Sequence, residues 1–230
     1  MRVFAIGDLH LPGGDDKPMN VFGAQWTGHF NRIREDWSAR VGEEDAVLIP
    51  GDISWAMQLE DAVPDLLSIG ELPGKKVLLR GNHDYWWGSV TRVRDALPRD
   101  MYVIQNDALK LEDTVICGSR GWTGEETAED KKIFSRELLR LEMSLRRASE
   151  LGGRMIVMCH YPPCGENGAE TEVTRLIGQY PVSDVVYGHL HGTQVNAFNG
   201  MISGIRYYCV SCDQIGFALK LLPDETEKTE

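Results

Sequence analysis

The fold is decided by the stretch Val77-Leu78-Leu79-Arg80-Gly81-Asn82-His83-Asp84. Its apolar part predicts a short buried strand, and its polar part places potential ligands where that strand ends. Ligands of open α/β sheets bind at the carboxyl ends of the strands, where several loops meet. An apolar run with a polar end recurs four more times: Val3–Ile6 before Gly7-Asp8-Leu9-His10, Ala46–Ile49 before Gly51-Asp52, Met155–Met158 before Cys159-His160, and Val185–Tyr187 before Gly188-His189-Leu190-His191.

Amphipathic stretches lie between these apolar runs. Residues 30–41 and 133–145 repeat apolar side chains at helical spacing, and Gly152-Gly153 ends the second stretch. Strands that alternate with helices predict an α/β fold. Further apolar runs have no helix between them, which predicts mixed sheets in a two-sheet arrangement: Tyr102–Ile104, Thr114–Cys117, Ile205–Val210 and Phe217–Leu221.

The chain has 230 residues and no repeat, low-complexity tract or change of composition that would mark a linker. A chain of this length buries one good core, so we expect a single domain over residues 1–222. Residues 223–230 are polar and charged, which predicts a frayed C-terminal tail. Residues 11–26 and 119–130 are expected to form long irregular loops, and whether either closes over a substrate is left open.

The formal net charge of -11 argues against a general nucleic-acid binder, which needs a basic face to neutralise phosphates. No apolar run approaches the roughly 20 residues of a membrane-spanning helix, and the first residues indicate a strand rather than an export signal. The five cysteines are an odd number without a disulfide framework, and Cys209-x-x-Cys212 has no second pair, so both are expected to be core or surface residues. These features favour a cytoplasmic protein.

Five of the six histidines fall within the polar strand ends, which leaves His29 unassigned. Asp-x-His and His-x-His spacing would turn both side chains to one face of an extended chain. Each segment is a weak signal by itself, and their conjunction predicts a metal site. Mixed oxygen and imidazole donors suit Mn, Fe or Zn. The candidate ligands are too many for one ion and indicate two: Asp8, His10, Asp52, Asn82, His160, His189 and His191.

Taken in order, these segments resemble the calcineurin-like metallophosphoesterase superfamily, over most of the chain and most closely a compact bacterial-type member. The resemblance implies a four-layer αββα sandwich, with two mixed β-sheets packed between helices and a di-metal site at the strand ends. It also implies the distribution of ligands: Asp8, His10 and His191 on the first ion, Asn82, His160 and His189 on the second, and Asp52 with a hydroxide between both.

The same resemblance implies that His83 is the general acid that protonates the leaving oxygen, with Asp84 orienting its ring. An imidazole can donate a proton near neutral pH, and a neighbouring carboxylate favours its protonated form. Arg80 and Arg120 are candidates to neutralise a substrate phosphate. Trp122 lies beside the proposed site and is a candidate to stack on an aromatic group.

One departure concerns the second motif, because the protein Ser/Thr phosphatase branch continues it with an Asp-Arg pair. Here Gly51-Asp52 is followed by Ile53-Ser54-Trp55-Ala56, which puts that specificity in doubt.

The sequence therefore predicts a binuclear metal-dependent phosphoesterase that hydrolyses a phosphate mono- or diester of a small molecule or nucleotide. The alternatives are a non-catalytic scaffold of the same fold and, within enzymes, a protein Ser/Thr phosphatase or a nuclease, the last disfavoured by the acidic charge. Monoester or diester preference, the native metal pair and the oligomeric state stay open.

Overall fold

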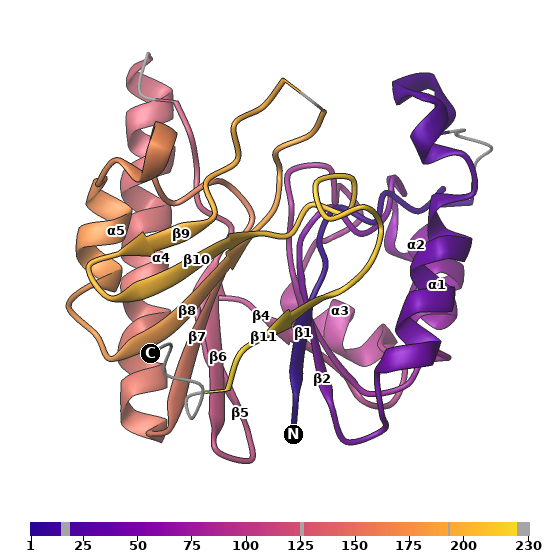
Figure 1. Cartoon of the computed structure of the whole chain (residues 1–230), viewed down its shortest axis with the longest axis horizontal. Coiled ribbons are helices and arrows are strands. Elements are labelled where there is room, and N and C mark those ends of the chain that lie inside the picture. Colours follow the sequence, from indigo (N-terminus) through magenta and orange to yellow (C-terminus); the bar gives the residue numbers. More distant parts are fainter. Residues whose placement is uncertain (15–18, 125–126, 193, 225–230) are drawn as a thin grey trace.

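The computed structural model describes residues 1–14, 19–124, 127–192 and 194–224. Two β-sheets face each other (Figure 1), with the strand orders β11-β1-β2-β3-β4 and β5-β6-β7-β8-β10-β9. The first sheet comprises β1 (Val3–Ala5), β2 (Ala46–Pro50), β3 (Lys75–Leu79), β4 (Met101–Ile104) and β11 (Lys220–Leu222). The second comprises β5 (Ala108–Leu111), β6 (Thr114–Ser119), β7 (Arg154–Cys159), β8 (Val182–Tyr187), β9 (Gly200–Ile202) and β10 (Ile205–Cys209).

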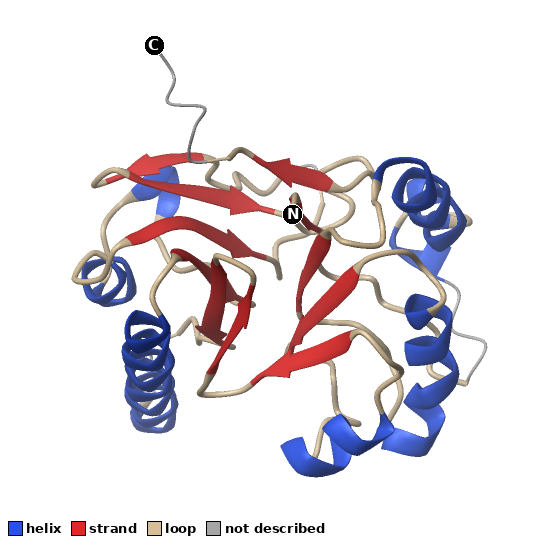
Figure 2. Cartoon of the chain, turned by 90° about the horizontal axis from the view of Figure 1, so that it is seen from below, coloured by secondary structure: helices blue, strands red, loops and turns tan. Residues whose placement is uncertain are grey.

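Helices cover the outer face of each sheet, as Figure 2 shows from below. The helices α1 (His29–Arg40), α2 (Leu59–Gly70) and α3 (Val90–Ala96) share an apolar cluster with the first sheet. The helices α4 (Ala128–Leu151) and α5 (Glu172–Ile177) share another with the second sheet. The molecule is therefore a four-layer α/β sandwich, as the family resemblance implied. Short 3-10 turns form η1 (Met19–Phe22), η2 (Ala24–Trp26) and η3 (Glu166–Gly168).

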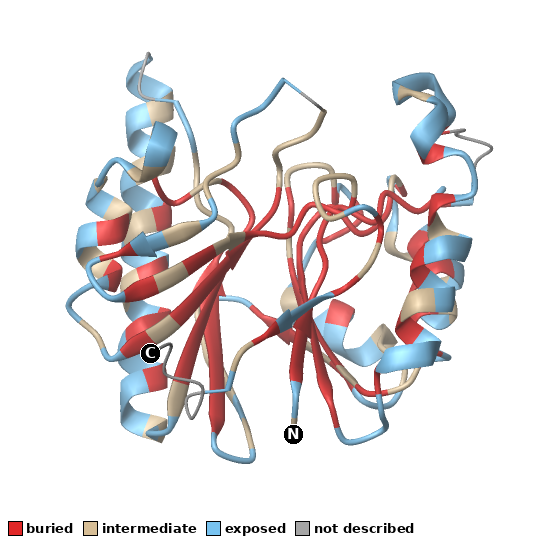
Figure 3. Ribbon diagram, in the orientation of Figure 1, coloured by how far each residue is buried: buried red, intermediate tan, exposed pale blue. Residues whose placement is uncertain are grey.

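Successive side chains of each strand contribute to two different parts of the apolar core, one beneath the helices and one between the sheets. Successive side chains of a strand point to opposite faces, so Phe4 of β1 packs under the helices of the first sheet. Its neighbours Val3 and Ala5 lie between the two sheets, in one cluster with Ile116 of β6 and Ile156 of β7. Figure 3 shows the central strands of the two sheets, among them β1, β2 and β6, as continuously buried. Strands buried on both faces explain the uninterrupted apolar runs.

The two sheets are joined where their strands end. Within the first sheet β1 to β4 are parallel, and within the second β6, β7, β8 and β10 are parallel. Just beyond β1 and β10, Gly7 and Ser211 form a parallel bridge. The Gly7 N–H donates to the Val210 carbonyl at 2.7 Å, and the Cys212 N–H donates to the Gly7 carbonyl at 3.1 Å. The carboxyl ends of the parallel strands of both sheets thus lie close together.

The predicted strands that carry polar ends all exist, and the two predicted helices correspond to α1 and α4, with Gly152 as the C-cap of α4. The predicted strand Phe217–Leu221 is wrong at its start, because Phe217 has a φ of 61° and the strand begins at Lys220. The residues 225–230 of the expected tail lie outside the described residues. Five elements were not predicted from the apolar runs: α2, α3, α5, β5 and β9.

Two buried charged groups tie elements together away from the strand ends. The Lys76 ammonium donates to the carbonyls of Gly70, Leu72 and Gly74 at 3.2, 2.8 and 2.8 Å, just after α2 ends. The fully buried Asp184 of β8 accepts hydrogen bonds from Arg154 of β7 and Arg206 of β10, both at 2.7 Å. Among the described residues, no helix combines the length and apolar character needed to cross a bilayer.

Candidate metal centre

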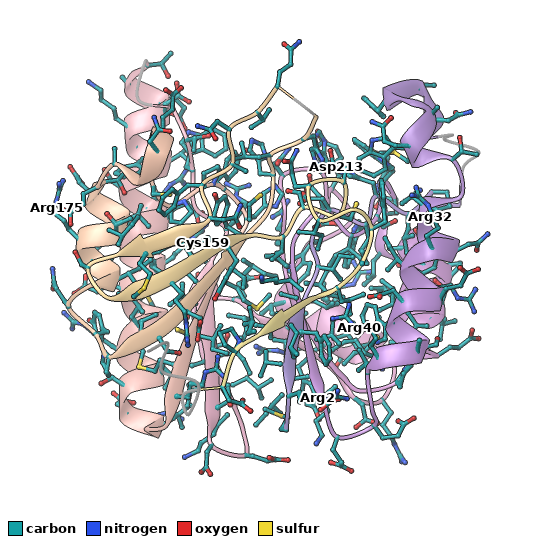
Figure 4. The ribbon with its side chains drawn as sticks, in the orientation of Figure 1. Arg2, Arg32, Arg40, Cys159, Arg175 and Asp213 are labelled. Atoms are coloured by element: carbon teal, nitrogen blue, oxygen red, sulfur yellow. The ribbon has the colours of Figure 1, made fainter. Side chains whose placement is uncertain are left out.

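All seven predicted ligand side chains come together at the edge where the strand ends of both sheets meet. Figure 4 labels two residues beside this edge, Cys159 at the end of β7 and Asp213 in the loop after β10. Four of the candidates follow strands of the first sheet and three follow strands of the second. They are Asp8 and His10 after β1, Asp52 after β2, Asn82 after β3, His160 after β7, and His189 and His191 after β8.

Asp8, His10 and His191 form one cluster, in which the potential ligand atoms all lie within 4.8 Å of one another. Nε2 of His10 lies 3.3 Å from Nε2 of His191, which lies 3.6 Å from Oδ1 of Asp8. Two ring nitrogens that face each other beside a carboxylate form a donor set suited to a divalent transition metal.

Asn82, His160 and His189 form a second cluster. The amide oxygen of Asn82 lies 2.6 Å from Nε2 of His160 and 2.9 Å from Nδ1 of His189. Asp52 lies between the clusters, with Oδ1 3.6 Å from Nε2 of His160 and Oδ2 3.9 Å from Nε2 of His10. One oxygen of Asp52 therefore faces each cluster.

Asp8, Asp52 and Asp84 are all buried. Their like charges repel one another strongly because little water screens them. Burial, together with the charges of Asp84 and Asp8, raises the pKa of Asp52 to about 9. Burial would also raise the pKa of Asp8, but a hydrogen bond to His191 and the charge of His160 lower it overall. Bound cations relieve such repulsion, so the charge distribution fits a metal centre.

Hydrogen bonds set the orientation of two of the rings. Nδ1 of His160 lies 3.0 Å from the Pro50 carbonyl, and Nδ1 of His191 lies 2.9 Å from Oδ1 of Asp213. An N–H that donates to oxygen through Nδ1 leaves the Nε2 lone pair free, as metal-ligating histidines require. Sequence reasoning missed Asp213, although it follows the predicted strand Ile205–Val210 as the other site residues follow theirs.

The backbone at these strand ends is not extended, in contrast to the conformation assumed from the spacing of the ligands. Asp8, His10, Asp52 and His189 have φ values of 58°, 46°, 52° and 73°. Left-handed backbone in residues other than glycine is strained and persists where the surrounding structure holds it. The ligands thus converge through tight turns rather than by alternation along a strand.

Glycines allow these turns to approach the carboxylates closely. A Cβ atom added to Gly81 would lie 2.1 Å from Oδ1 of Asp52, and one added to Gly188 would lie 2.5 Å from Oδ2 of Asp8. Either contact is far shorter than real side chains tolerate. The glycines that precede Asn82 and His189 therefore leave room for the carboxylates of the opposite turns.

The family model of the calcineurin-like phosphoesterases matches residues 1–193. The chain belongs to this family. Membership of this family, together with the close approach of the Asp8, His10, Asp52 and His160 side chains, indicates a divalent-metal site. A search of curated protein sequences found no match.

Three solved structures with the same fold are distant in sequence from this calcineurin-like phosphoesterase. Phosphopantetheinyl hydrolase from Mycobacterium tuberculosis is 12% identical with a TM-score of 0.59, covering 100% of this chain and 98% of that one. A protein of unknown function from Aquifex aeolicus is 15% identical with a TM-score of 0.52, over 96% and 95%. The anchor in the inner membrane complex of Plasmodium is 13% identical with a TM-score of 0.54, over 92% and 71%. At these identities the likeness concerns the fold alone.

Asp84 lies next to His83 in the sequence but does not orient its ring. The Asp84 carboxylate is fully buried and accepts five N–H bonds, which tie the turn after β2 to the turn after β3. These donors use both of its oxygens. Asp84 therefore holds the two turns together in place of the expected contact with the His83 ring. The donors are the backbone N–H groups of Asp52, Ile53, Ser54 and Gly81 and the indole of Trp86, at 2.7 to 3.2 Å.

His83 itself stands at the edge of the metal site. Its backbone N–H donates to Oδ1 of Asp52 at 2.8 Å, and its ring centroid lies 5.9 Å from that of His10 and 4.5 Å from that of Trp55. Burial and the positive charge of His191 lower the pKa of the His83 imidazole. His83 and His191 both line a mostly apolar cavity of about 430 Å³, whose wall includes Met19, Phe22, Trp26 and Trp55.

The predicted substrate-binding residues are not all brought to the metal centre. Arg80 and Arg120 line a separate cavity of about 150 Å³ that has none of the seven candidate ligands in its wall. The Trp122 ring packs 5.3 Å from the ring of Tyr161 and lies at the same distance from the Arg120 guanidinium. Tyr161 in turn packs 4.3 Å from His189, so Trp122 reaches the site only through that ring.

The remaining histidine and the cysteines have structural positions. Nε2 of His29 lies 2.8 Å from the Leu9 carbonyl, so this buried ring fastens the start of α1 to the turn that carries Asp8 and His10. All five cysteines are free and buried. Of the two positions expected for Cys209 and Cys212, core or surface, both residues occupy the core.

Proposed function

We propose that this calcineurin-like phosphoesterase is a binuclear metal-dependent hydrolase of phosphate mono- or diesters. The observation that carries the proposal is the position of Asp52, which turns one carboxylate oxygen toward each of the two clusters of candidate ligands. A bridging carboxylate between two sets of oxygen and imidazole donors is the arrangement that two neighbouring cations need.

In this proposal each ion takes ligands from both sheets. Asp8, His10 and His191 would hold the first ion, which their mutual distances support. Asn82, His160 and His189 would hold the second, which the contacts of the Asn82 amide oxygen support. The donor types suit Mn, Fe or Zn.

When bound, two such ions would polarise the phosphoryl oxygens and lower the pKa of a water molecule at the site. The chain's own contribution to bond cleavage is then the proton for the leaving oxygen. His83 would supply it, which is supported by its ring lining the same cavity as His10 and His191 while its ring nitrogens are absent from both clusters. The negative charge of a bound phosphate would favour the protonated imidazole against the effect of burial.

The substrate would be a phosphorylated small molecule or a nucleotide, since the cavity beside the metal centre has room for one. Its organic part would pack against the apolar wall that Trp26 and Trp55 provide. Arg80, Arg120 and Trp122 would also contribute to substrate binding. We place the enzyme in the cytoplasm, in keeping with the free cysteines.

The alternative is a scaffold that retains the fold without the reaction. A Plasmodium protein of the same fold is described as the anchor in the inner membrane complex. The complete set of candidate ligands and the presence of His83 favour the hydrolase, since a pure scaffold does not need them.

The decisive experiment measures hydrolysis of p-nitrophenyl phosphate and bis-p-nitrophenyl phosphate by the full chain, stripped of metal and reloaded with manganese. We expect metal-dependent turnover that Asp52→Asn abolishes together with metal binding. His83→Ala should lower kcat by about 10² to 10⁴ while metal content stays intact. Asp61→Asn, at an exposed aspartate of α2, is the matched control. Full metal loading without turnover of either ester would favour the scaffold, and failure to bind metal would refute the proposal.

A further inference from the structure

A polar cavity lies beside the metal centre, between the ends of β3, β4 and β6 and the outer helix α4. It measures about 150 Å³ and is lined by Arg80, Arg120, Arg140 and Glu137, with Gln105 and Asn106 at the end of β4. The lining brings three guanidinium groups against a single carboxylate, in a chain whose formal net charge is -11.

The one carboxylate is already used. Glu137 is buried, and its Oε1 lies 2.6 Å from a guanidinium nitrogen of Arg140 and 3.8 Å from one of Arg120. Arg80 has no acidic partner within salt-bridge distance among the described residues. At least one positive charge on the cavity wall is therefore left without a counter-charge.

Hydrogen-bond donors on this wall are also left over. Nε of Arg80 and Nε of Arg120 are shielded from solvent and have no hydrogen-bond partner among the described residues. A buried N–H of a charged group without an acceptor is costly, and folded proteins rarely retain one.

We propose that this cavity is a binding site for a phosphate-sized oxyanion, distinct from the metal centre. Guanidinium groups present paired donors that match the oxygens of a phosphate group. Three such groups with a single carboxylate among them, around a polar cavity of this size, supply both the charge and the hydrogen-bond donors that the anion needs.

Two arginines of the cavity wall are linked through the backbone to segments that carry candidate ligands. Arg80 precedes Asn82 by two residues, and the carbonyl of Arg120 accepts the backbone N–H groups of His160 and Tyr161 at 3.1 and 2.9 Å. The anion is either the second phosphate of a substrate whose first phosphate lies at the metals, or free inorganic phosphate. The first source rests on the proposed hydrolase function, whereas the binding site itself does not.

The binding test is calorimetric titration of the full, manganese-loaded chain with inorganic phosphate at constant ionic strength. We expect two binding events, one at the metal centre and one in the cavity. Asp52→Asn should remove the first and retain the second. Arg80→Gln and Arg120→Gln should each weaken the second by at least about tenfold, and Arg80→Lys, which keeps the charge, by less.

The matched control is Arg92→Gln, at an exposed arginine of α3 that pairs with Glu60, which should retain both events. A single event that disappears in Asp52→Asn and survives both glutamine variants would overturn the inference. Equal weakening by Arg92→Gln would also overturn it, since the effect would then reflect overall charge. Thermal unfolding of each variant establishes that it is folded. Phosphate binding in the cavity of a protein without hydrolase activity would refute the proposed function alone.

A kinetic comparison distinguishes the two sources of the anion. The substrates are alkanediol monophosphates and the matching bisphosphates of increasing linker length. A second substrate phosphate predicts that kcat/KM favours the bisphosphate at one linker length and that Arg120→Gln removes this preference. Free phosphate as the ligand predicts no preference at any length, with the cavity event still present in the titration.

Discussion

Nδ1 of His191 lies 2.9 Å from Oδ1 of Asp213, so an aspartate outside the seven candidate ligands fixes the orientation of one of them. The other oxygen of Asp213 accepts the backbone N–H of Gly192 at 2.8 Å, which holds the carboxylate in place. A carboxylate behind a histidine ligand raises its basicity and strengthens metal binding.

Replacing Asp213 should therefore weaken metal binding without removing a ligand. We expect Asp213→Asn to lower the affinity for manganese by about 10- to 100-fold, measured by calorimetric titration of metal-stripped protein. Asp95→Asn, at an exposed aspartate of α3, serves as the control and should bind as the wild type does. Unchanged affinity in the Asp213 variant would show that His191 does not need this support.

The glycine before Asn82 offers a steric test of the site. In Gly81→Ala the new Cβ would press on Oδ1 of Asp52 from 2.1 Å, so either the turn or the carboxylate must move. We expect a loss of about 1 to 3 kcal/mol in the free energy of unfolding and at least a tenfold loss of metal affinity. Gly88→Ala is the control, because nothing lies within 4 Å of its added Cβ. Equal behaviour of the two variants would contradict the close approach of the turns.

The buried ammonium of Lys76 should contribute to stability through its three carbonyl acceptors. Lys76→Met leaves those carbonyls without their donor and should lower the free energy of unfolding by about 1 to 3 kcal/mol. Lys75→Met removes only the ion pair with the exposed Glu44 and should cost less than about 1 kcal/mol. Chemical denaturation of both variants measures the difference, and an equal cost would argue against a role for the buried ammonium.

The same lysine predicts a pH dependence. Burial lowers the pKa of Lys76 from its usual 10.5, so the native protein releases this proton at a lower pH than the unfolded chain does. Between the two pKa values the unfolded chain binds more protons, so this group makes the free energy of unfolding rise with pH. The stability of the wild type relative to Lys76→Met should therefore increase as the pH rises toward 10.5. A difference that stays flat or falls over that window would contradict the lowered pKa.

Asp184 should be a strong stabilising residue of the second sheet. Asp184→Ala would leave Arg154 and Arg206 facing each other without their shared carboxylate, and we expect a loss of about 3 to 5 kcal/mol. Asp224 also lies 3.7 Å from Arg154 but is largely exposed, so Asp224→Ala should cost less than about 1 kcal/mol. Thermal and denaturant unfolding of the pair measures both effects. A small loss in Asp184→Ala would mean that the arginines find other partners.

The polar-ended strands and the candidate ligands that follow them could be picked out from local patterns, whereas the four layers were implied by the family resemblance. A strand buried on both faces has an uninterrupted apolar run, and the change to Gly, Asp, Asn or His marks its end. The helices α3 and α5, with seven and six residues, are too short for a periodic pattern to be visible. In α2 an internal Pro64 interrupts a pattern that is otherwise apolar on one side.

The roles of individual side chains were harder to predict, because they depend on which distant groups are near. Asp84 follows His83 in the sequence, yet the donors that fix its carboxylate include N–H groups of the turn after β2. Arg80 precedes the ligand segment, yet it lines a cavity with Arg140 of α4. These residues were expected to act with their neighbours in the sequence, but in the folded protein their side chains contact groups from distant segments.

Because the candidate ligands are divided between the sheets, a protein split into two fragments would divide them as well. Residues 3–104 build nearly all of the first sheet, residues 108–209 build the second, and each proposed ion needs donors from both. Two separately produced halves, cut in the connection between β4 and β5, would each hold an incomplete ligand set. Their reassembly would then be favoured by the metal as well as by the apolar layer between the sheets. Such a split protein would report metal by complementation, joining when the ions are supplied and separating when a chelator removes them.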